Sequence, residues 1–189
     1  MATEPRTFLT PEEYLEHERK AECKSEYYQG EMFAMAGASP RHADIITNII
    51  GLFWQQLKGR PCRATANDVR LKIPPTGLYT YPDVMVICGD RQVADNQKDT
   101  VLNPTVIVEV LSDSTRDYDR GLKFQQYRTL ASLAEYLTVA QDAPHVEHWT
   151  RQPENRWLLA EYGDLSSNIA LESIGCMLPL SEIYDRITF

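Results

Sequence analysis

Two carboxylates lie in apolar segments of the chain, where their charge must be offset. Asp83 opens the apolar run 84–87, and Glu109 lies inside the run 106–111. Runs this apolar are typical of central strands covered on both faces. An unpaired carboxylate in such a strand is costly or takes up a proton. A divalent cation between the two acids would offset both charges. The pattern therefore indicates a metal site, although strand-end acids in two unrelated salt bridges would look the same.

A basic residue follows these strands on a segment with helical spacing. Asp119, Lys123 and Tyr127 recur at i, i+4 and i+8, so they share one face of the expected helix. If that face turns toward the end of the Glu109 strand, Lys123 reaches the two acids. A lysine on a helix is more often a solvated surface residue, so Lys123 alone is a weak signal.

Taken together, these residues resemble the Uma2 family of the PD-(D/E)XK nuclease superfamily. The resemblance runs over nearly the whole chain and implies a single domain, 1–189. It also implies an α/β (α+β) restriction-endonuclease-like fold, in which helices flank a mixed central β-sheet. The matching residues are Tyr81-Pro82-Asp83, then Val108-Glu109-Val110-Leu111-Ser112, then Asp119, Lys123 and Tyr127.

The resemblance also implies a site and a reaction. Asp83, Glu109 and the backbone carbonyl of Val110 would hold Mg²⁺, with Mn²⁺ as the alternative ion. The expected activity is that of a metal-dependent endodeoxyribonuclease, which hydrolyses phosphodiester bonds of DNA. Leu111 stands where the superfamily usually has lysine, which implies a migrated lysine, and Lys123 is the candidate. The chain has no nucleotide-binding loop, so we expect no nucleotide cofactor.

Three further residues are candidates for the same site. Glu26 would be an additional acid, because nuclease sites of this type often take one from an N-terminal element; the alternative is an exposed hairpin residue. His42 would contact phosphate or carry a proton, although a surface histidine in a first helical turn is the commoner case. Tyr127 shares the helix face of Lys123.

Composition limits the classes of protein that the chain can belong to. The length of 189 residues suits one domain with a sizeable core. No apolar stretch is long enough to cross a bilayer, and the first residues lack a signal-peptide core, so we expect a cytoplasmic protein with no membrane partner. The net charge of −8 argues against a generic nucleic-acid binder, but residues 41–130 carry twelve basic and ten acidic side chains. The motif region is thus the least acidic part.

A second function remains open on these observations. The same fold could act as a nucleic-acid-binding or dimerisation module with a decayed site, and Leu111 and the net charge favour that alternative. For an active enzyme we expect a homodimer, since cutting both strands of a duplex needs two sites. Trp149 and Trp157, on late hairpins, are the expected interface residues.

Local signals predict the flanking elements. A helix begins at Thr10-Pro11, a hairpin turns at Gln29-Gly30, and a second helix runs from Ser39-Pro40 to about residue 57. Residues 89–103 are polar, which suggests a mobile surface loop. The four cysteines are scattered without a Cys-x-x-Cys pair, so we expect thiols rather than a disulfide or a zinc site.

Overall fold

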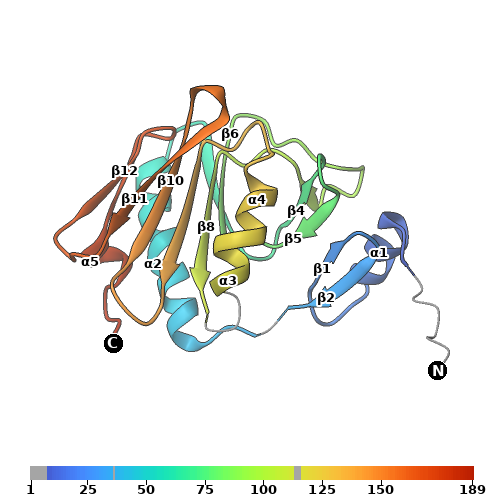
Figure 1. The fold of residues 1–189 in the computed structure, drawn as a ribbon, viewed down its shortest axis with the longest axis horizontal. Helices are drawn as coiled ribbons and strands as arrows, with labels where there is room; N and C mark the ends of the chain where they lie inside the picture. The colour runs from blue at the N-terminus through green and yellow to red at the C-terminus, as the bar shows by residue number, and fades with distance from the viewer. Residues whose placement is uncertain (1–7, 36, 113–115) are drawn as a thin grey trace.

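The computed structural model describes residues 8–35, 37–112 and 116–189, and its centre is a mixed sheet of six strands in the order β11-β10-β9-β8-β6-β3 (Figure 1). Neighbouring strands are antiparallel except β8 and β9, which are parallel. The strands are β3 (Cys62–Ala66), β6 (Val84–Cys88), β8 (Val106–Leu111), β9 (Glu135–Ala140), β10 (Val146–Gln152) and β11 (Arg156–Tyr162). The expected mixed central sheet is confirmed.

Two smaller sheets accompany the central one. A five-stranded sheet has the order β2-β1-β5-β4-β7, and β12 and β13 form a separate two-stranded ribbon. Their bounds are β1 (Ser25–Tyr28), β2 (Glu31–Ala34), β4 (Arg70–Ile73), β5 (Leu78–Thr80), β7 (Thr100–Val101), β12 (Asn168–Leu171) and β13 (Cys176–Pro179). The hairpin of β1 and β2 turns at Gln29-Gly30, as expected, and both turn residues have positive φ. A turn of this kind matches the right-handed twist of the two strands.

Helices lie on both faces of the central sheet, and the first helix lies beside the smaller five-stranded sheet (Figure 1). A parallel strand pair needs a long crossover, and the helical segment α3-η1-α4 makes that connection between β8 and β9. The helices are α1 (Pro11–Glu18), α2 (Pro40–Leu57), α3 (Arg116–Tyr118), the π-helical turn η1 (Asp119–Lys123), α4 (Phe124–Tyr127), the 3₁₀ turn η2 (Pro153–Asn155) and α5 (Leu180–Ile183). None of the helices within the described ranges is long and apolar enough to cross a membrane.

The starts of α1 and α2 follow from their sequences. Thr10 accepts a hydrogen bond from the backbone N–H of Glu13, whose side chain bonds back to Thr10, and Pro11 holds the first helical position. In α2 the side chain of Ser39 accepts a hydrogen bond from the backbone N–H of His42, and Pro40 comes first in the helix. These caps satisfy N–H groups that a helix cannot pair internally. Both helix starts agree with the sequence expectations.

Alternation along β8 separates two apolar cores. Val106, Val108 and Val110 join the core that α2 forms with the β12–β13 ribbon and α5. Ile107 points to the opposite face, where α4 and the strands β4 and β5 pack. Because side chains alternate along a strand, Glu109 falls on the face of Ile107. The carboxylate is therefore directed at the helical segment that follows β8.

The late hairpin and the polar segment 89–103 both place side chains in the apolar core. Trp149 and Trp157 are half-buried and pack against Phe124, Trp149 in a tilted contact and Trp157 edge-on, so both rings contribute to the core. Within 89–103, β7 pairs in parallel with β4, and Val101 is fully buried. Arg19 also forms ion pairs with two acids of this segment. The expectation of a mobile surface loop over residues 89–103 is therefore wrong for Thr100–Val101.

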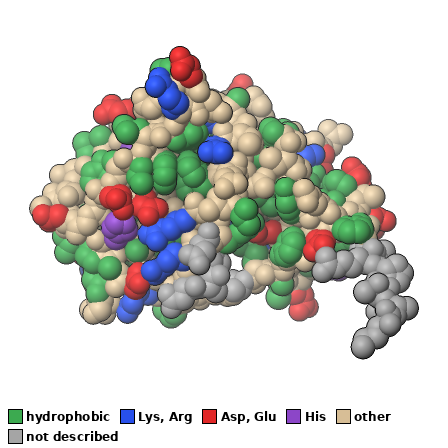
Figure 2. Space-filling model, viewed as in Figure 1, with side chains coloured by type: hydrophobic (Ala, Val, Ile, Leu, Met, Phe, Trp, Pro, Cys, Tyr) green, Lys and Arg blue, Asp and Glu red, His purple; other side chains and the backbone are tan. Residues whose placement is uncertain are grey.

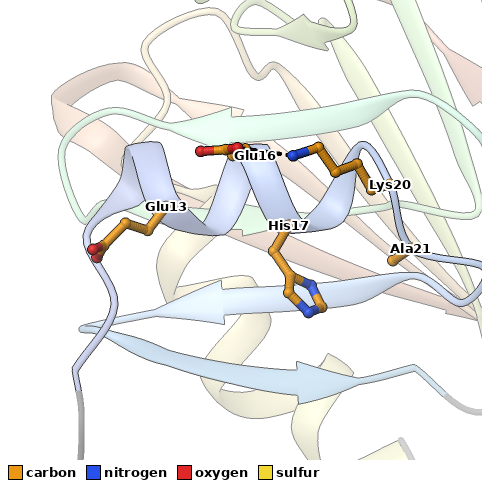
Figure 3. Close-up of a pocket in the computed structure, with 5 residues that line it drawn as sticks. All are labelled: Glu13, Glu16, His17, Lys20 and Ala21. Carbon is orange, nitrogen blue, oxygen red and sulfur yellow. Dashed lines mark hydrogen bonds and ion pairs between the residues drawn. The ribbon is translucent and has the colours of Figure 1, made fainter.

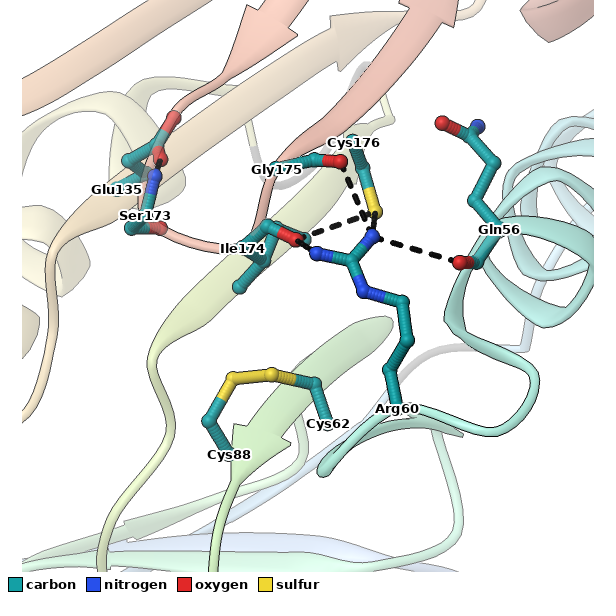
Figure 4. The surroundings of a disulfide bond; sticks show 9 residues. All are labelled: Gln56, Arg60, Cys62, Cys88, Glu135, Ser173, Ile174, Gly175 and Cys176. Carbon is teal, nitrogen blue, oxygen red and sulfur yellow. Dashed lines mark hydrogen bonds between the residues drawn. A yellow bond between two sulfur atoms is a disulfide. The ribbon is translucent and has the colours of Figure 1, made fainter.

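The cysteine expectation is also wrong. Cys62 and Cys88 face each other across the antiparallel pair β3–β6 and form a disulfide (Figure 4). Spacing along the chain does not show this pairing, because 26 positions separate the two residues and only the strand register brings them together. Cys23 is exposed and Cys176 is buried, and both are thiols. Beside the disulfide, Arg60 donates hydrogen bonds to the carbonyl groups of Ile174 and Gly175, which ties α2 to the β12–β13 ribbon.

Replacing both bridged cysteines with serine should lower the free energy of unfolding by about 3 kcal/mol. The disulfide joins residues that are 26 positions apart, and closing this loop lowers the conformational entropy of the unfolded chain. Urea unfolding, with and without a reductant, measures this loss. The reductant should bring the parent protein to the stability of the double variant and leave that variant unchanged. Cys23→Ser is the control and should unfold like the parent. A double variant as stable as the oxidised parent would contradict the stabilising role of this bond.

Candidate active site

Strand pairing brings Asp83 and Glu109 together. Strand β6 is antiparallel to β8, with Val84 opposite Val108, so the start of β6 lies beside the end of β8. The backbone N–H of Asp83 donates to Glu109 Oε2 over 3.2 Å. In return, the backbone N–H of Val110 donates to Asp83 Oδ2 over 2.7 Å. These reciprocal bonds hold the two carboxylates at one edge of the sheet.

Glu109 is almost completely enclosed, with 2% of its surface exposed. The hydroxyl group of Tyr127 donates to Glu109 Oε1 over 2.6 Å, and Lys123 Nζ lies 3.0 Å from the same oxygen. Burial raises the pKa of Glu109 to about 8; Lys123 opposes this shift, whereas the charges of Asp83 and Asp119 add to it. Near neutral pH the carboxyl group of Glu109 therefore favours binding a proton or having a cation beside it.

Lys123 lies in the π-helical turn and is buried with the acids instead of projecting into solvent. Its ammonium group lies 3.3 Å from Asp119 Oδ1 and 3.4 Å from Glu26 Oε1. Burial on its own lowers the pKa of Lys123, but Glu109 and the other anionic neighbours outweigh burial and raise the pKa well above its ordinary value. π-Helical turns are rare and are frequently found at functional sites. This lysine is therefore charged and placed within reach of three carboxylates.

Glu26 reaches the same cluster from the smaller sheet. It is buried on β1, where Glu26 Oε1 accepts a hydrogen bond from the hydroxyl group of Thr80. Its other oxygen, Oε2, accepts a hydrogen bond from the hydroxyl group of Tyr118 over 2.9 Å. The interpretation of Glu26 as an exposed hairpin residue is therefore wrong. The cluster lies between the two sheets, and it includes side chains from both.

His42 completes the group from the opposite face of the central sheet. It lies in the first turn of α2 with 9% of its surface exposed, and its Nε2 atom is 3.3 Å from Asp83 Oδ2. Burial lowers the pKa of His42, but the hydrogen bond and charge of Asp83, together with the backbone of Val110, outweigh burial and raise it. The surface position considered for this histidine is therefore wrong.

The structure brings every sequence-predicted site residue into one cluster. These residues are Glu26, His42, Asp83, Glu109, Val110, Lys123 and Tyr127. Sequence reasoning missed Thr80 and Tyr118, the two hydroxyl donors to Glu26. Thr80 is close to Asp83 in the chain, which is a weak signal, whereas nothing in the sequence distinguishes Tyr118 from a packing residue.

Leu111 leaves the end of β8 without a lysine, and its side chain is fully buried. The neighbouring helical segment places an ammonium group beside Glu109 instead. Lys123 thus supplies a positive charge beside Glu109, and its role as a migrated catalytic lysine stays a prediction.

The donor atoms suit a divalent cation. Oxygen ligands from carboxylates and backbone carbonyls are those that Mg²⁺ and Mn²⁺ prefer. Glu26, Glu109 and Asp119 gather around Lys123, and Asp83 is hydrogen-bonded to Glu109, so acidic groups outnumber this lysine within the cluster. Burial is the main cause of the raised pKa of Glu109, and the charges of Asp83 and Asp119 add to it. The types of donor atom therefore suit such an ion, and the metal site at these residues stays a prediction.

Other surface features lie away from this cluster. A hollow of about 350 Å³ runs along α1 and is lined by Glu13, Glu16, His17, Lys20 and Ala21 (Figure 3). It contains none of the clustered acids and is open to solvent, so it offers no enclosed place for chemistry. On the face drawn in Figure 2, basic side chains stand among acidic and apolar ones rather than in a broad basic surface.

Structural comparison identifies the class of fold. The chain superposes with a TM-score of 0.76 on a crystal structure from Anabaena variabilis described as "a putative nuclease belonging to DUF820". The similarity covers 95% of this chain and 99% of the other, at 15% sequence identity. The two chains therefore share one fold, with the mixed central sheet and flanking helices that the sequence led us to expect.

Sequence comparison identifies the family. A family model described as "Uma2: Putative restriction endonuclease" matches residues 11–180. Protein sll1609 of Synechocystis is 40% identical over 153 residues, which cover 81% of this chain and 86% of that protein. Protein slr1290 of the same organism is 36% identical over 181 residues, which cover 96% of this chain and 94% of that protein. The chain belongs to the Uma2 family, and the resemblance seen in its motifs is confirmed.

The raised pKa of Glu109 predicts a pH dependence of stability. Because the pKa rises from 4.5 to about 8 on folding, the folded protein takes up a proton in this range. The stability from this group is complete below the unfolded pKa and is lost as the pH rises through about 8. Glu109→Gln mimics the protonated acid, so the free energy of unfolding of this variant should not fall in this way as the pH rises. Unfolding free energies from pH 5 to 9, measured in a chelator, test this expectation.

Glu135→Gln provides a control of opposite sign. Burial raises the pKa of Glu135, but hydrogen bonds from His148 and Ser173 outweigh burial and lower it. The stability from this charge is present above the unfolded pKa and is lost as the pH falls through the folded value. Glu135→Gln should therefore be destabilised at neutral pH. If the stability of Glu109→Gln depended on pH as that of the parent protein does, Glu109 would not be the acid whose pKa burial raises.

Proposed function

We propose that this protein is an endonuclease that uses Mg²⁺ or Mn²⁺ to hydrolyse phosphodiester bonds of DNA. Its membership of a family described as restriction endonucleases supports a nuclease activity. The observation that carries the proposal is the buried contact of Lys123 with Glu109, next to Asp83. A purely structural core would gain nothing from gathering so many acids around a lysine, because buried ion pairs contribute little to stability.

The chain's own residues divide the work. Asp83, Glu109 and the carbonyl of Val110 would hold the ion at the edge of the central sheet. The chemistry that such an ion supplies is Lewis acidity toward the phosphate and acidification of a water molecule. Lys123 keeps a fixed positive charge beside the acids, where it would orient the attacking water or stabilise the charge on the phosphate oxygens. Glu26, Asp119 and Tyr127 position Lys123 and Glu109 through the contacts described above.

Two further statements belong to the proposal. DNA binding by a chain of net charge −8 requires that basic side chains near the site contact the phosphates locally. A homodimer would supply two sites for the two strands of a duplex. Trp149 and Trp157 remain the proposed interface, although both rings also pack on Phe124. The cytoplasmic location and the absence of a nucleotide cofactor remain predictions.

Metal binding can be tested without any substrate. Adding MgCl₂ or MnCl₂ should raise the melting temperature of the parent protein, because an ion that binds only the folded state stabilises it by mass action. Asp83→Asn should abolish that shift, since the variant removes a charged ligand at nearly constant volume. The matched control, Glu135→Gln, removes a buried carboxylate outside the cluster and should keep the shift. Equal shifts in Asp83→Asn and the parent would exclude this metal site.

Cleavage assays separate the enzyme from the alternative of a decayed binding module. On single-stranded, double-stranded and branched DNA, Asp83→Asn and Glu109→Gln should remain folded and lose activity by about three orders of magnitude or more. Lys123→Ala should also lose cleavage while it retains or tightens metal binding, because a competing positive charge is gone. Lys123→Arg should rescue poorly, since the guanidinium group cannot occupy the compact space of the ammonium group. A metal-dependent thermal shift without cleavage of any DNA would favour the decayed module.

A further inference from the structure

A group of metal-ligating side chains lies on strands β10 and β11, away from the acids around Lys123. His145, Glu147 and Glu161 each offer one donor atom, and these atoms all lie within 4.8 Å of one another. His145 directly precedes β10, and Glu147 follows two positions later, a spacing that places both side chains on one face of a strand. Glu161 lies directly opposite Glu147 in the antiparallel pair. Strand register therefore brings one imidazole and two carboxylates together.

The pairing of Glu147 with Glu161 lacks a full set of matching positive charges. Like charges directly opposite each other on neighbouring strands are destabilising. Arg120 lies 3.0 Å from Glu147 Oε1 and offsets one of the two charges. In the part of the chain that the structure describes, Glu161 has no lysine or arginine partner, and its contact is with His145 Nε2 over 3.5 Å. A cation held between the two strands would remove the repulsion.

Neighbouring groups fix the positions of two of the three donors. The backbone N–H of His145 donates to the hydroxyl group of Tyr184 over 3.1 Å, and the backbone N–H of Ala140 donates to the carbonyl group of His145 over 2.9 Å. The hydroxyl group of Thr138 donates to Glu147 Oε2 over 3.0 Å. Outer groups of this kind orient metal ligands. A carboxylate that accepts such bonds still has lone pairs for an ion.

The distances suit a tetrahedral ion. Tetrahedral ligands with bonds of ~2.0–2.1 Å lie ~3.3 Å apart. His145 Nε2 and Glu161 Oε1 are 3.5 Å apart, close to that spacing and longer than an ordinary N–H···O hydrogen bond. The side chain of Glu161 is 58% exposed, so an ion can enter from solvent and the carboxylate can turn toward it. Three protein ligands with water in the fourth position are a common arrangement for Zn²⁺.

This group is separate from the acid pair Asp83 and Glu109. Glu109, Thr138, Glu147 and Glu161 are in register across the four adjacent strands β8, β9, β10 and β11. At roughly 4.8 Å between strands, Glu161 is about 14 Å from Glu109 along the sheet. One ion cannot bridge that distance, so the two groups would hold different ions.

We propose that His145, Glu147 and Glu161 form a transition-metal site that binds Zn²⁺. The inference goes beyond the proposed function and does not depend on it. An imidazole nitrogen binds transition-metal ions well, whereas Mg²⁺ and Ca²⁺ prefer oxygen ligands, and Mn²⁺ is the weakest binder of the first-row series. The site therefore selects Zn²⁺ over the ions proposed for the acid pair. The bound ion ties β11, the edge strand of the central sheet, to the start of β10.

Nuclear magnetic resonance of the histidine rings tests the direct bond in the parent protein. Added ZnCl₂ should shift the ring signals of His145. The signals of His148 should stay in place, because its Nε2 atom already lies 2.6 Å from Glu135 Oε2. Ring signals of His145 that do not change in excess ZnCl₂ would overturn the inference.

Variants then assign the ligands. The calorimetric affinity for Zn²⁺ should fall at least about tenfold in His145→Gln and in Glu161→Gln. Both variants should melt like the parent protein in a chelator, since both side chains lie at the surface. His17→Gln is the matched control, because His17 is also exposed and lines a hollow with Glu13 and Glu16. Zn²⁺ affinity that is lost in His17→Gln and retained in His145→Gln would overturn the inference.

Asp83→Asn distinguishes this site from that of the proposed function. In Asp83→Asn, ZnCl₂ should shift the ring signals of His145 as it does in the parent protein. In His145→Gln, MnCl₂ should still raise the melting temperature if the proposed acid-pair site exists. Loss of the His145 shift in Asp83→Asn would show that the two groups do not bind separately and would overturn the inference. A His145 shift that persists when no variant responds to MnCl₂ would leave the zinc site standing and remove the metal site of the proposed function.

Discussion

The central constraint on this molecule is the burial of the Glu109 carboxylate inside a strand that is otherwise apolar. A charge in such a place must be neutralised by a proton or matched by nearby cations and hydrogen-bond donors. Tyr127 and Lys123 supply a hydrogen bond and a positive charge to one oxygen, and the backbone of Asp83 supplies a hydrogen bond to the other. Both sheets and the helical crossover must be in place for these partners to meet. The stability of the fold and the composition of the site are therefore linked at one side chain.

The crossover between β8 and β9 explains how the lysine reaches the acid from a distant position in the chain. A parallel pair of strands requires a connection over one face of the sheet, and that face carries Glu109. The π-helical turn at Asp119–Lys123 lies within this connection, so its basic side chain points at the strand that precedes it. A lysine on β8 itself would share the strand with its acid. A lysine on the crossover instead depends on how the helix packs against the sheet.

The small sheet has a role beyond enlarging the core. Through Glu26 it contributes an acid that contacts Lys123, while Thr80 and Tyr118 hold the carboxylate in place. On the other side of the central sheet, α2 brings His42 to Asp83. The cluster thus joins elements from both faces of the sheet at its edge, where β6 begins and β8 ends.

The sequence alone predicted the main helices and strands of this protein and the residues that meet in the cluster. Capping residues marked the starts of α1 and α2, alternation marked β8, and buried acids with a helical lysine indicated the site, because these signals are local. Tertiary structure decided the rest. The burial of Glu26 and His42, the hydroxyl donors Thr80 and Tyr118, and the Cys62–Cys88 disulfide all depend on contacts between residues far apart in the chain. Strand register and helix packing set such contacts, and a single sequence does not reveal either one.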